Sequence, residues 1–211
     1  MPATSAPELL VLHAVRLKGM TDAPAVAARF DLDRDEVAEI LLDQQAYGWV
    51  QKVGFADLSG WGLTDAGRAR NEAMLAAELD RVGARAAFEA AHQEFVPLNA
   101  RLLDAVTRWQ LRPEPGDALA VNDHTDHRWD DRVLADLASV VRRVGPLCAP
   151  LAAALVRFEG YPERLSAAMR RVEAGERRWV DQITIDSLHT VWFELHEDLL
   201  ATLNVSRGSP G

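Results

Sequence analysis

The strongest fold signal in this chain is the stretch YGWVQKVGFADLSGWGLTDAGRAR, residues 47–70. Residues 49–55 contain the β-branched and aromatic residues typical of a strand, although they alternate with polar positions only in part. Residues 56–60 combine alanine, aspartate, serine and glycine and predict a hairpin turn, after which residues 61–63 return as a second strand. Thr64 then has the side chain expected at a helix N-cap. The predicted order is strand, turn, strand and helix.

Three short helices are predicted before this hairpin. Pro7 suits the first turn of the first helix, and Gly19 ends it. Asp22 and Asp33 are placed to cap the second and third helices with their carboxylates. Gly48 ends the third helix immediately before the hairpin. A two-stranded ribbon after such helices is the arrangement of a winged helix-turn-helix.

Residues 8–72 resemble the winged helix-turn-helix of MarR-like bacterial regulators. The resemblance rests on AVAARFDLDRDEVAEIL (25–41), AYGWVQKV (46–53) and above all WGLTDAGRAR (61–70), and it covers roughly a third of the chain. It implies a dimer that binds specific DNA sequences, with the third helix in the major groove and the wing on phosphate. The candidate DNA-binding residues are Arg16, Lys18, Arg34, Gln45 and Lys52.

The charge of this region departs from that expectation. The chain has a net charge of -9, and residues 1–80 hold 7 Lys or Arg against 13 Asp or Glu. Residues 31–45, around the third helix, contain six acidic residues and only one arginine. Because attraction to phosphate supplies most non-specific DNA affinity, acidic side chains on the docking face oppose it. The alternative is a protein-interaction adaptor, or a regulatory subunit of an enzyme, whose winged helix does not bind DNA.

The second half, residues 81–211, has helical patterns throughout and one long loop, residues 112–126. We therefore predict a mainly α fold, in which a winged helix domain (1–80) precedes an all-α dimerisation and effector domain (81–211). Gly145 and Pro146 are expected to separate two of its helices. This half resembles uncharacterised actinobacterial regulators.

A group of aromatic and histidine residues in the second half predicts a site for a small-molecule effector. On a helix, positions 189, 192 and 196 share one face. Histidines that face inward beside tryptophans need hydrogen bonds or a ligand. The candidate ligand-binding residues are Trp109, Trp129, Trp179, His189, Trp192 and His196. The alternative is a core stripe in which buried partners satisfy these polar groups.

Metal binding and catalysis have less support in the sequence. His124 and His127, three residues apart among carboxylates, are candidates for a divalent metal. The alternative is a polar loop in which Asp126 or Asp130 caps the next helix and the histidines are solvated. Catalytic motifs such as GxSxG, HExxH and phosphate-binding glycine loops are absent. We therefore expect no enzyme activity and no cofactor.

The cellular location is predicted from features that are missing. The single cysteine, Cys148, excludes an intramolecular disulfide. The N-terminal residues have no pattern of a signal peptide, and no apolar run approaches the ~20 residues of a membrane span. The expectation is a cytoplasmic protein that makes no membrane contact.

Overall fold

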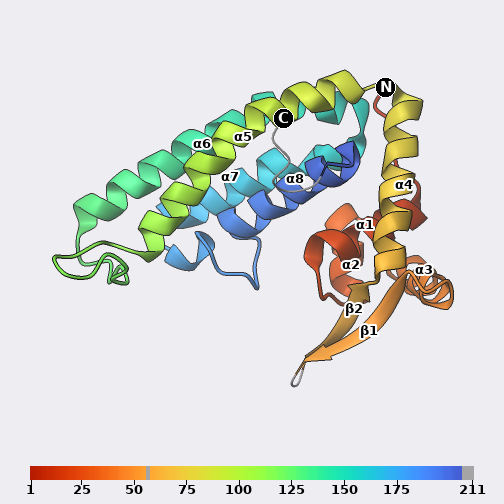
Figure 1. Cartoon of the computed structure of the whole chain (residues 1–211), viewed down its shortest axis with the longest axis horizontal. Helices are drawn as coiled ribbons and strands as arrows, with labels where there is room; N and C mark the ends of the chain where they lie inside the picture. Colours follow the sequence, from red (N-terminus) through yellow and green to blue (C-terminus); the bar gives the residue numbers. More distant parts are fainter. Residues whose placement is uncertain (56–57, 206–211) are drawn as a thin grey trace. The chain divides into compact units, whose positions relative to one another are not determined.

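The computed structural model describes residues 1–55 and 58–205 of the chain. In this part the chain forms eight α-helices and one two-stranded antiparallel sheet, which confirms the predicted mainly α fold (Figure 1). The elements in chain order are α1 (Pro7–Lys18), α2 (Ala23–Phe30), α3 (Arg34–Ala46), β1 (Val50–Phe55), β2 (Leu58–Leu63), α4 (Asp65–Val82), α5 (Arg85–Gln110), α6 (His127–Ala154), α7 (Gly160–Glu173) and α8 (Leu188–Leu203). Short 3₁₀ helices cover Val156–Phe158 and Arg177–Trp179.

The chain divides into two compact units that do not follow each other along the sequence. Unit 1 consists of Met1–Arg85, Ala153–Arg157 and His196–Gly211. Unit 2 consists of Ala86–Ala152 and Phe158–Leu195. The winged helix elements therefore share their unit with two later segments of the chain. The domain boundary at residue 80 stays a prediction.

The helices of unit 1 begin where their capping residues predict. The Asp22 carboxylate accepts a hydrogen bond from the Ala25 amide at 2.8 Å, at the start of α2. The Asp33 carboxylate accepts from two amides, each at 3.0 Å, at the start of α3. Such caps satisfy backbone donors that have no partner inside the helix. Both predicted caps are confirmed.

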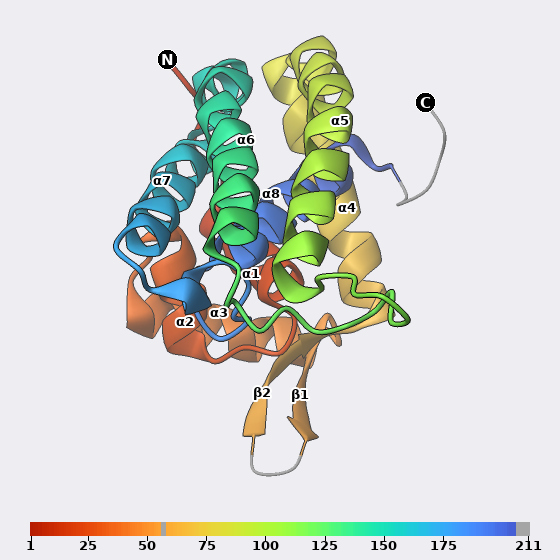
Figure 2. The same ribbon diagram turned by 90° about the vertical axis from the view of Figure 1, so that its left-hand side faces the viewer.

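The wing is the antiparallel pair β1 and β2, with Val50 opposite Leu63, and Figure 2 shows it as a hairpin extending from the helices of unit 1. The predicted turn, 56–60, is wrong in its second half because residues 58–60 belong to β2; residues 56 and 57 lie outside the described residues. Gly60 is needed in this strand because a Cβ atom there would lie 2.8 Å from the carbonyl oxygen of Thr21.

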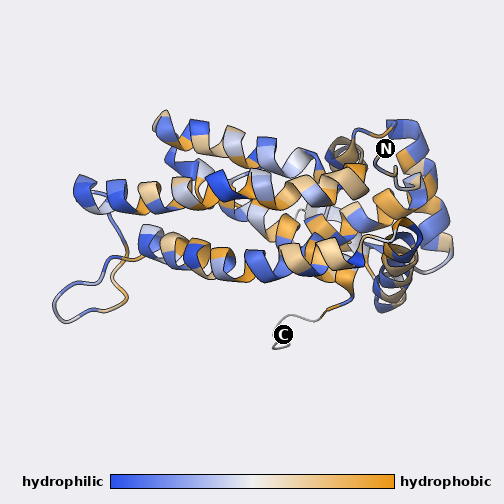
Figure 3. Ribbon diagram, turned by 90° about the horizontal axis from the view of Figure 1, so that it is seen from above, coloured by the Kyte–Doolittle hydropathy of each residue, from blue (hydrophilic) through white to orange (hydrophobic). Residues whose placement is uncertain are grey.

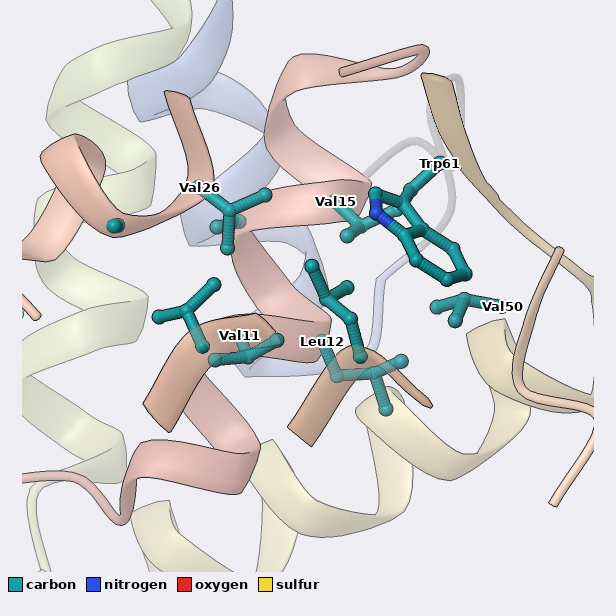
Figure 4. Close-up of a cluster of buried hydrophobic side chains, with 10 residues drawn as sticks. Val11, Leu12, Val15, Val26, Val50 and Trp61 are labelled. Carbon is teal, nitrogen blue, oxygen red and sulfur yellow. The ribbon is translucent and has the colours of Figure 1, made fainter. Parts of the chain in front are cut away.

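The core of unit 1 lies between the first three helices and the wing. Val11, Leu12 and Val15 of α1 meet Val26 of α2 and Trp61 of β2 in one buried cluster (Figure 4). Val37 and Leu41 of α3 and Val50 of β1 complete it. Burying a side chain of this size stabilises a fold by roughly 1.5–3 kcal/mol relative to its exposure. The apolar positions predicted for these helices therefore hold the wing against them.

The connection from the wing to α4 explains why the LTDAGR segment is so informative. The Thr64 hydroxyl accepts a hydrogen bond from the Gly67 amide at 3.0 Å and lies 2.7 Å from the Gly48 carbonyl oxygen, to which it can donate. Gly67 allows a close approach of two backbone segments, since a Cβ atom there would lie 1.9 Å from the Trp49 carbonyl oxygen. This segment therefore needs both a capping threonine and a glycine three residues later.

Unit 2 is built from α5, α6, α7 and the first half of α8, and Figure 3 shows their ribbons carrying both hydrophobic and hydrophilic residues. The predicted break at Gly145 and Pro146 is wrong, because α6 continues through Pro146 and Pro150 to Ala154. Each proline removes one backbone hydrogen bond. The buried residues on either side, Val144 and Leu147, keep the same face packed, and burial outweighs the local preference for a break.

Helix α6 is the one described helix that is long and apolar enough to cross a bilayer, judged by length and composition alone. It is amphipathic, however. Val133, Leu137 and Val144 are buried, whereas Arg142 and Arg143 are exposed. This pattern is typical of a core helix in a water-soluble protein. The cytoplasmic location stays a prediction.

Candidate functional site

The exposed face of α3 is acidic and partly apolar. In a winged helix this is the surface that would enter the major groove of DNA. Asp35, Glu39 and Asp43 follow one another at helical spacing and are all exposed. Leu42 lies among them with 60% of its surface exposed, and Tyr47 at the end of the helix is 68% exposed. The face therefore combines negative charge with apolar surface.

Three of the five candidate DNA-binding residues lie on the surface of unit 1. Arg34, at the first position of α3, and Gln45, near its end, are both exposed. Lys52 is exposed on β1, and its ammonium lies 3.7 Å from the centroid of the Trp61 ring, in a cation–π contact. Of these three residues, Arg34 and Lys52 supply two positive charges, which are outnumbered by the exposed carboxylates of α3.

The other two candidates are less accessible. The Arg16 side chain is only 7% exposed, and its guanidinium donates to Glu72 at 2.9 Å and to Glu197 at 2.8 Å. It is therefore held inside unit 1 and is a poor DNA contact. Lys18 is half-buried. The Glu197 partner could not be predicted from local patterns because that residue lies 181 positions further along the chain.

Gln44 illustrates how α3 is fixed. It lies on the buried side of the helix and is 2% exposed. Its side-chain amide donates a hydrogen bond to the Glu8 carbonyl at 2.9 Å, at the start of α1. A buried amide needs such a partner, since an unsatisfied buried polar group costs about 1–3 kcal/mol. This hydrogen bond lies on the buried side of α3 and helps to fix the orientation of the acidic face on the opposite side.

Unit 1 contains a buried network of charged and polar residues that is not among the residues predicted from the sequence. Arg157 is its centre: its guanidinium pairs with Glu78, lies 3.4 Å from Asp198, and donates to Thr202 at 2.9 Å. His13 Nε2 lies 3.0 Å from Asp198 Oδ1. These side chains come from four distant parts of the chain. The only local signals of this network in the sequence are His13 and Asp198, each a polar residue within an apolar helical pattern.

The charges in this network hold Asp198 in its ionised form. Burial by itself raises the pKa of this carboxyl, but the charges of His13 and Arg157 outweigh it and hold the pKa well below its ordinary value of 3.8. Asp198 has 0% exposed surface, so no water screens these interactions. The network therefore ties the last turns of α8 to α1 within the unit.

Two of the candidate effector residues, Trp192 and Trp109, have different partners in unit 2. The Trp192 indole donates to Asn99 at 2.9 Å and stacks on Phe95. Trp109 instead packs against His124, with ring centroids 4.3 Å apart. Ten residues of α5 separate Asn99 from Trp109, which corresponds to about 15 Å along a helix. These contacts are separate, and the effector pocket stays a prediction.

The remaining candidates have separate surroundings. The Trp129 indole donates to the Arg108 carbonyl at 2.8 Å, and the Trp179 indole donates to Glu176 at 3.1 Å. His189 and His196 are both half-buried, and His196 belongs to unit 1. With Trp192, three indole N–H groups thus have internal partners. The core-stripe alternative accounts for these contacts.

A shallow groove in unit 1 involves different residues. It has a volume of about 380 Å³ and is lined by Ala6, Leu9, Arg70, Ala73, Met74, Ala77, Glu78 and Arg81. These residues come from the start of α1 and from one face of α4. None of the candidate effector residues lines it.

The two candidate metal ligands lie at the end of the loop between α5 and α6 and at the start of α6. His127 is exposed at the first position of α6, whereas His124 Nδ1 lies 3.0 Å from the Asp130 carboxylate. Among the described residues there is no group of three or more His, Cys, Asp or Glu placed to hold a metal ion. Asp126 caps α6, since its carboxylate accepts from the Trp129 amide at 3.1 Å. The capping alternative is confirmed for Asp126.

Comparison with protein-family models, with curated proteins and with solved structures found no match. The winged-helix shape of unit 1 therefore rests on its own helices and hairpin. The relationship to MarR-like regulators stays a prediction carried by the sequence motifs.

Proposed function

We propose that this chain is a regulatory protein that acts through its winged helix, and that the exposed face of α3 binds a basic protein surface. The observation that carries the proposal is the combination of exposed Asp35, Glu39 and Asp43 with the exposed apolar side chain of Leu42. An apolar centre with charged surroundings is the usual composition of a protein interface. The partner has complementary positive charge, which speeds association and selects against acidic proteins.

DNA binding by the same face is opposed by electrostatics. A protein gains DNA affinity by replacing counterions with lysine and arginine at the phosphates. The exposed basic candidates are Arg34 on α3 and Lys52 on β1, while Arg16 is already paired inside the unit. Acidic side chains over phosphate would repel it at low salt, where attraction should be greatest. These charges favour a protein partner over DNA.

The second candidate function is a DNA-binding transcriptional regulator. The wing supports it, because β1 carries exposed Lys52 where a winged helix contacts phosphate, and Arg34 is exposed at the start of α3. This function would include a homodimer and a small-molecule effector that changes the affinity for DNA. Its operator would contain an inverted repeat, as expected for a two-fold symmetric dimer.

The double substitution Glu36→Gln and Glu39→Gln separates the two functions. Both side chains are exposed on α3, so the fold should be unchanged. If α3 docks on DNA, removing two negative charges should strengthen non-specific binding by about tenfold or more at low salt. We expect instead no mobility shift of any duplex by the full chain or by this variant, tested with random-sequence DNA and the gene's own upstream region.

The same variant should lose its protein partner. Cross-linking and affinity capture with the full chain should retrieve a basic protein whose recovery falls at least tenfold in the variant. The matched control is Glu89→Gln with Glu94→Gln, which removes two exposed charges from α5 and should leave recovery unchanged. A sequence-specific shift that the wild-type chain gives, and that Arg34→Ala abolishes, would instead establish DNA binding.

A further inference from the structure

The groove in unit 1 follows one face of α4. Its α4 residues lie at positions 70, 73, 74, 77, 78 and 81, which is the spacing of a single helix face. From position 70 to position 81 this face runs for roughly 16 Å along the helix. Ala6 and Leu9, at the start of α1, form the other wall. The volume of about 380 Å³ lies within the range of roughly 300–1,000 Å³ that small-molecule sites occupy.

Between its two ends the groove is apolar. Leu9 belongs to a buried cluster that includes Ala201, and Met74 packs against the same cluster, so the apolar wall is supported by the core of the unit. Ala73 and Ala77 are exposed in the groove, and their single methyl groups leave the space that longer side chains would fill. This surface is already formed, and removing it from water favours the binding of a hydrocarbon.

The two ends of the groove differ in their charged groups. Arg70 is exposed at one end, and its guanidinium lies 5.0 Å from the centroid of the Trp49 ring. Among the residues that the structure describes, Arg70 has no carboxylate partner. Arg81, at the other end, lies 3.8 Å from Glu78, whose buried carboxylate also pairs with Arg157. The positive charge that is available to a ligand is therefore at the Arg70 end.

We propose that this groove binds a medium-chain fatty acid. The carboxylate accepts two parallel hydrogen bonds from the Arg70 guanidinium, the geometry in which arginine pairs with carboxylates. The alkyl chain lies along Ala73, Met74 and Ala77 and contacts Leu9. One anionic group followed by hydrocarbon matches one cation without a carboxylate partner followed by apolar surface.

The length of the groove indicates the length of the chain. Positions 70 and 78 are roughly 12 Å apart along α4, and about ten carbons joined by bonds of ~1.5 Å span that distance. A longer chain would reach the buried Glu78 carboxylate and the Arg81 guanidinium beside it. None of the lining residues belongs to α3, so this site is independent of what the α3 face binds.

Titration of the full chain with decanoate, followed by the ¹³C-methyl NMR signals of its methionines, tests the proposal. The Met74 signal should shift and saturate, whereas Met20 and Met169, which lie outside the groove, should not respond. Hexanoate should bind at least tenfold more weakly, because it buries four fewer methylene groups.

Two substitutions test the two parts of the site. Ala73→Leu fills the groove at an exposed position of α4, where leucine suits a helix, and should abolish the saturable binding of decanoate. Ala69→Leu adds the same side chain to α4 outside the groove and should leave binding unchanged. Arg70→Gln should weaken decanoate binding about threefold or more, whereas Arg68→Gln removes a charge outside the groove and should not.

Thermal unfolding of Ala73→Leu at the wild-type temperature would show that its loss of binding comes from the filled groove. Wild-type affinity in Ala73→Leu, or shifts confined to the other methionines, would overturn the proposal. Equal affinities for hexanoate and decanoate would contradict an alkyl chain lying along α4. Wild-type affinity in Arg70→Gln would contradict the pairing of the carboxylate.

Discussion

Asp198→Asn should lower the free energy of unfolding of unit 1 by about 3–5 kcal/mol at pH 7, the usual cost of removing one partner from a buried ion pair. The substitution keeps the shape of the side chain and removes its charge. Arg157 would retain Glu78 but lose Asp198, and His13 would lose the carboxylate that it faces. Most of the penalty comes from charges left buried without compensation.

The effect should depend on pH with a definite sign. The pKa of Asp198 in the folded chain is held below its ordinary value of 3.8, so its contribution is fully present above about pH 4. It is lost progressively as the pH falls below that value, because the unfolded chain then binds the proton first. The difference between wild type and Asp198→Asn should therefore shrink towards acid pH.

Urea unfolding followed by circular dichroism, with hydrogen exchange of the α1 peptide as a report on unit 1, measures both effects. Asp80→Ala is the matched control. Asp80 pairs with Arg85 at 3.3 Å, but both side chains are exposed, and such a pair is worth at most about 1 kcal/mol. An Asp198→Asn chain within 1 kcal/mol of wild type at pH 7 would contradict the importance given to the network.

Gly67→Ala should destabilise unit 1 by about 3 kcal/mol or more, at the upper end of the range for an inserted methyl group. The new Cβ would lie 1.9 Å from the Trp49 carbonyl oxygen. Both atoms belong to or adjoin the backbone, so no side-chain rotation relieves the overlap. The wing must move away from the start of α4, which would also strain the Thr64 cap.

Gly145→Ala is the matched control for Gly67→Ala. It adds the same methyl group in the interior of α6, where no other atom lies within 4 Å of the new Cβ. An alanine there should stabilise the chain by about 0.4–1 kcal/mol. Thermal unfolding of the two variants should thus shift in opposite directions. If Gly67→Ala unfolds at the wild-type temperature, the close approach at Trp49 is not required.

Features that depend on near neighbours could be predicted from the sequence. Asp22, Asp33 and Thr64 cap helices whose first turns lie within three residues of them, so the local pattern contained the whole interaction. The wing followed from the hairpin pattern for the same reason. The predicted turn, 56–60, is too long because Gly60 is typical of turns but lies in β2, where it allows the close approach of the Thr21 backbone.

Features that depend on distant neighbours could not be predicted. Arg16 looked like a free basic residue of α1, and only the folded chain brings Glu197 to it. Periodicity placed Trp192 on an inward face correctly, since it is 2% exposed. It could not give the position along α5 that Trp192 would meet, and so it could not distinguish one shared pocket from separate contacts.

The buried network also has a consequence for protein synthesis. The ribosome releases residues from the N-terminus onwards, so α1 to α4 emerge long before Arg157 and Asp198. Until the final turns of α8 leave the exit tunnel, His13 and Glu78 have no completed set of partners. A chain that stopped before α8 would lack Asp198, the carboxylate that His13 and Arg157 face. Folding of unit 1 is therefore completed only after α8 has emerged.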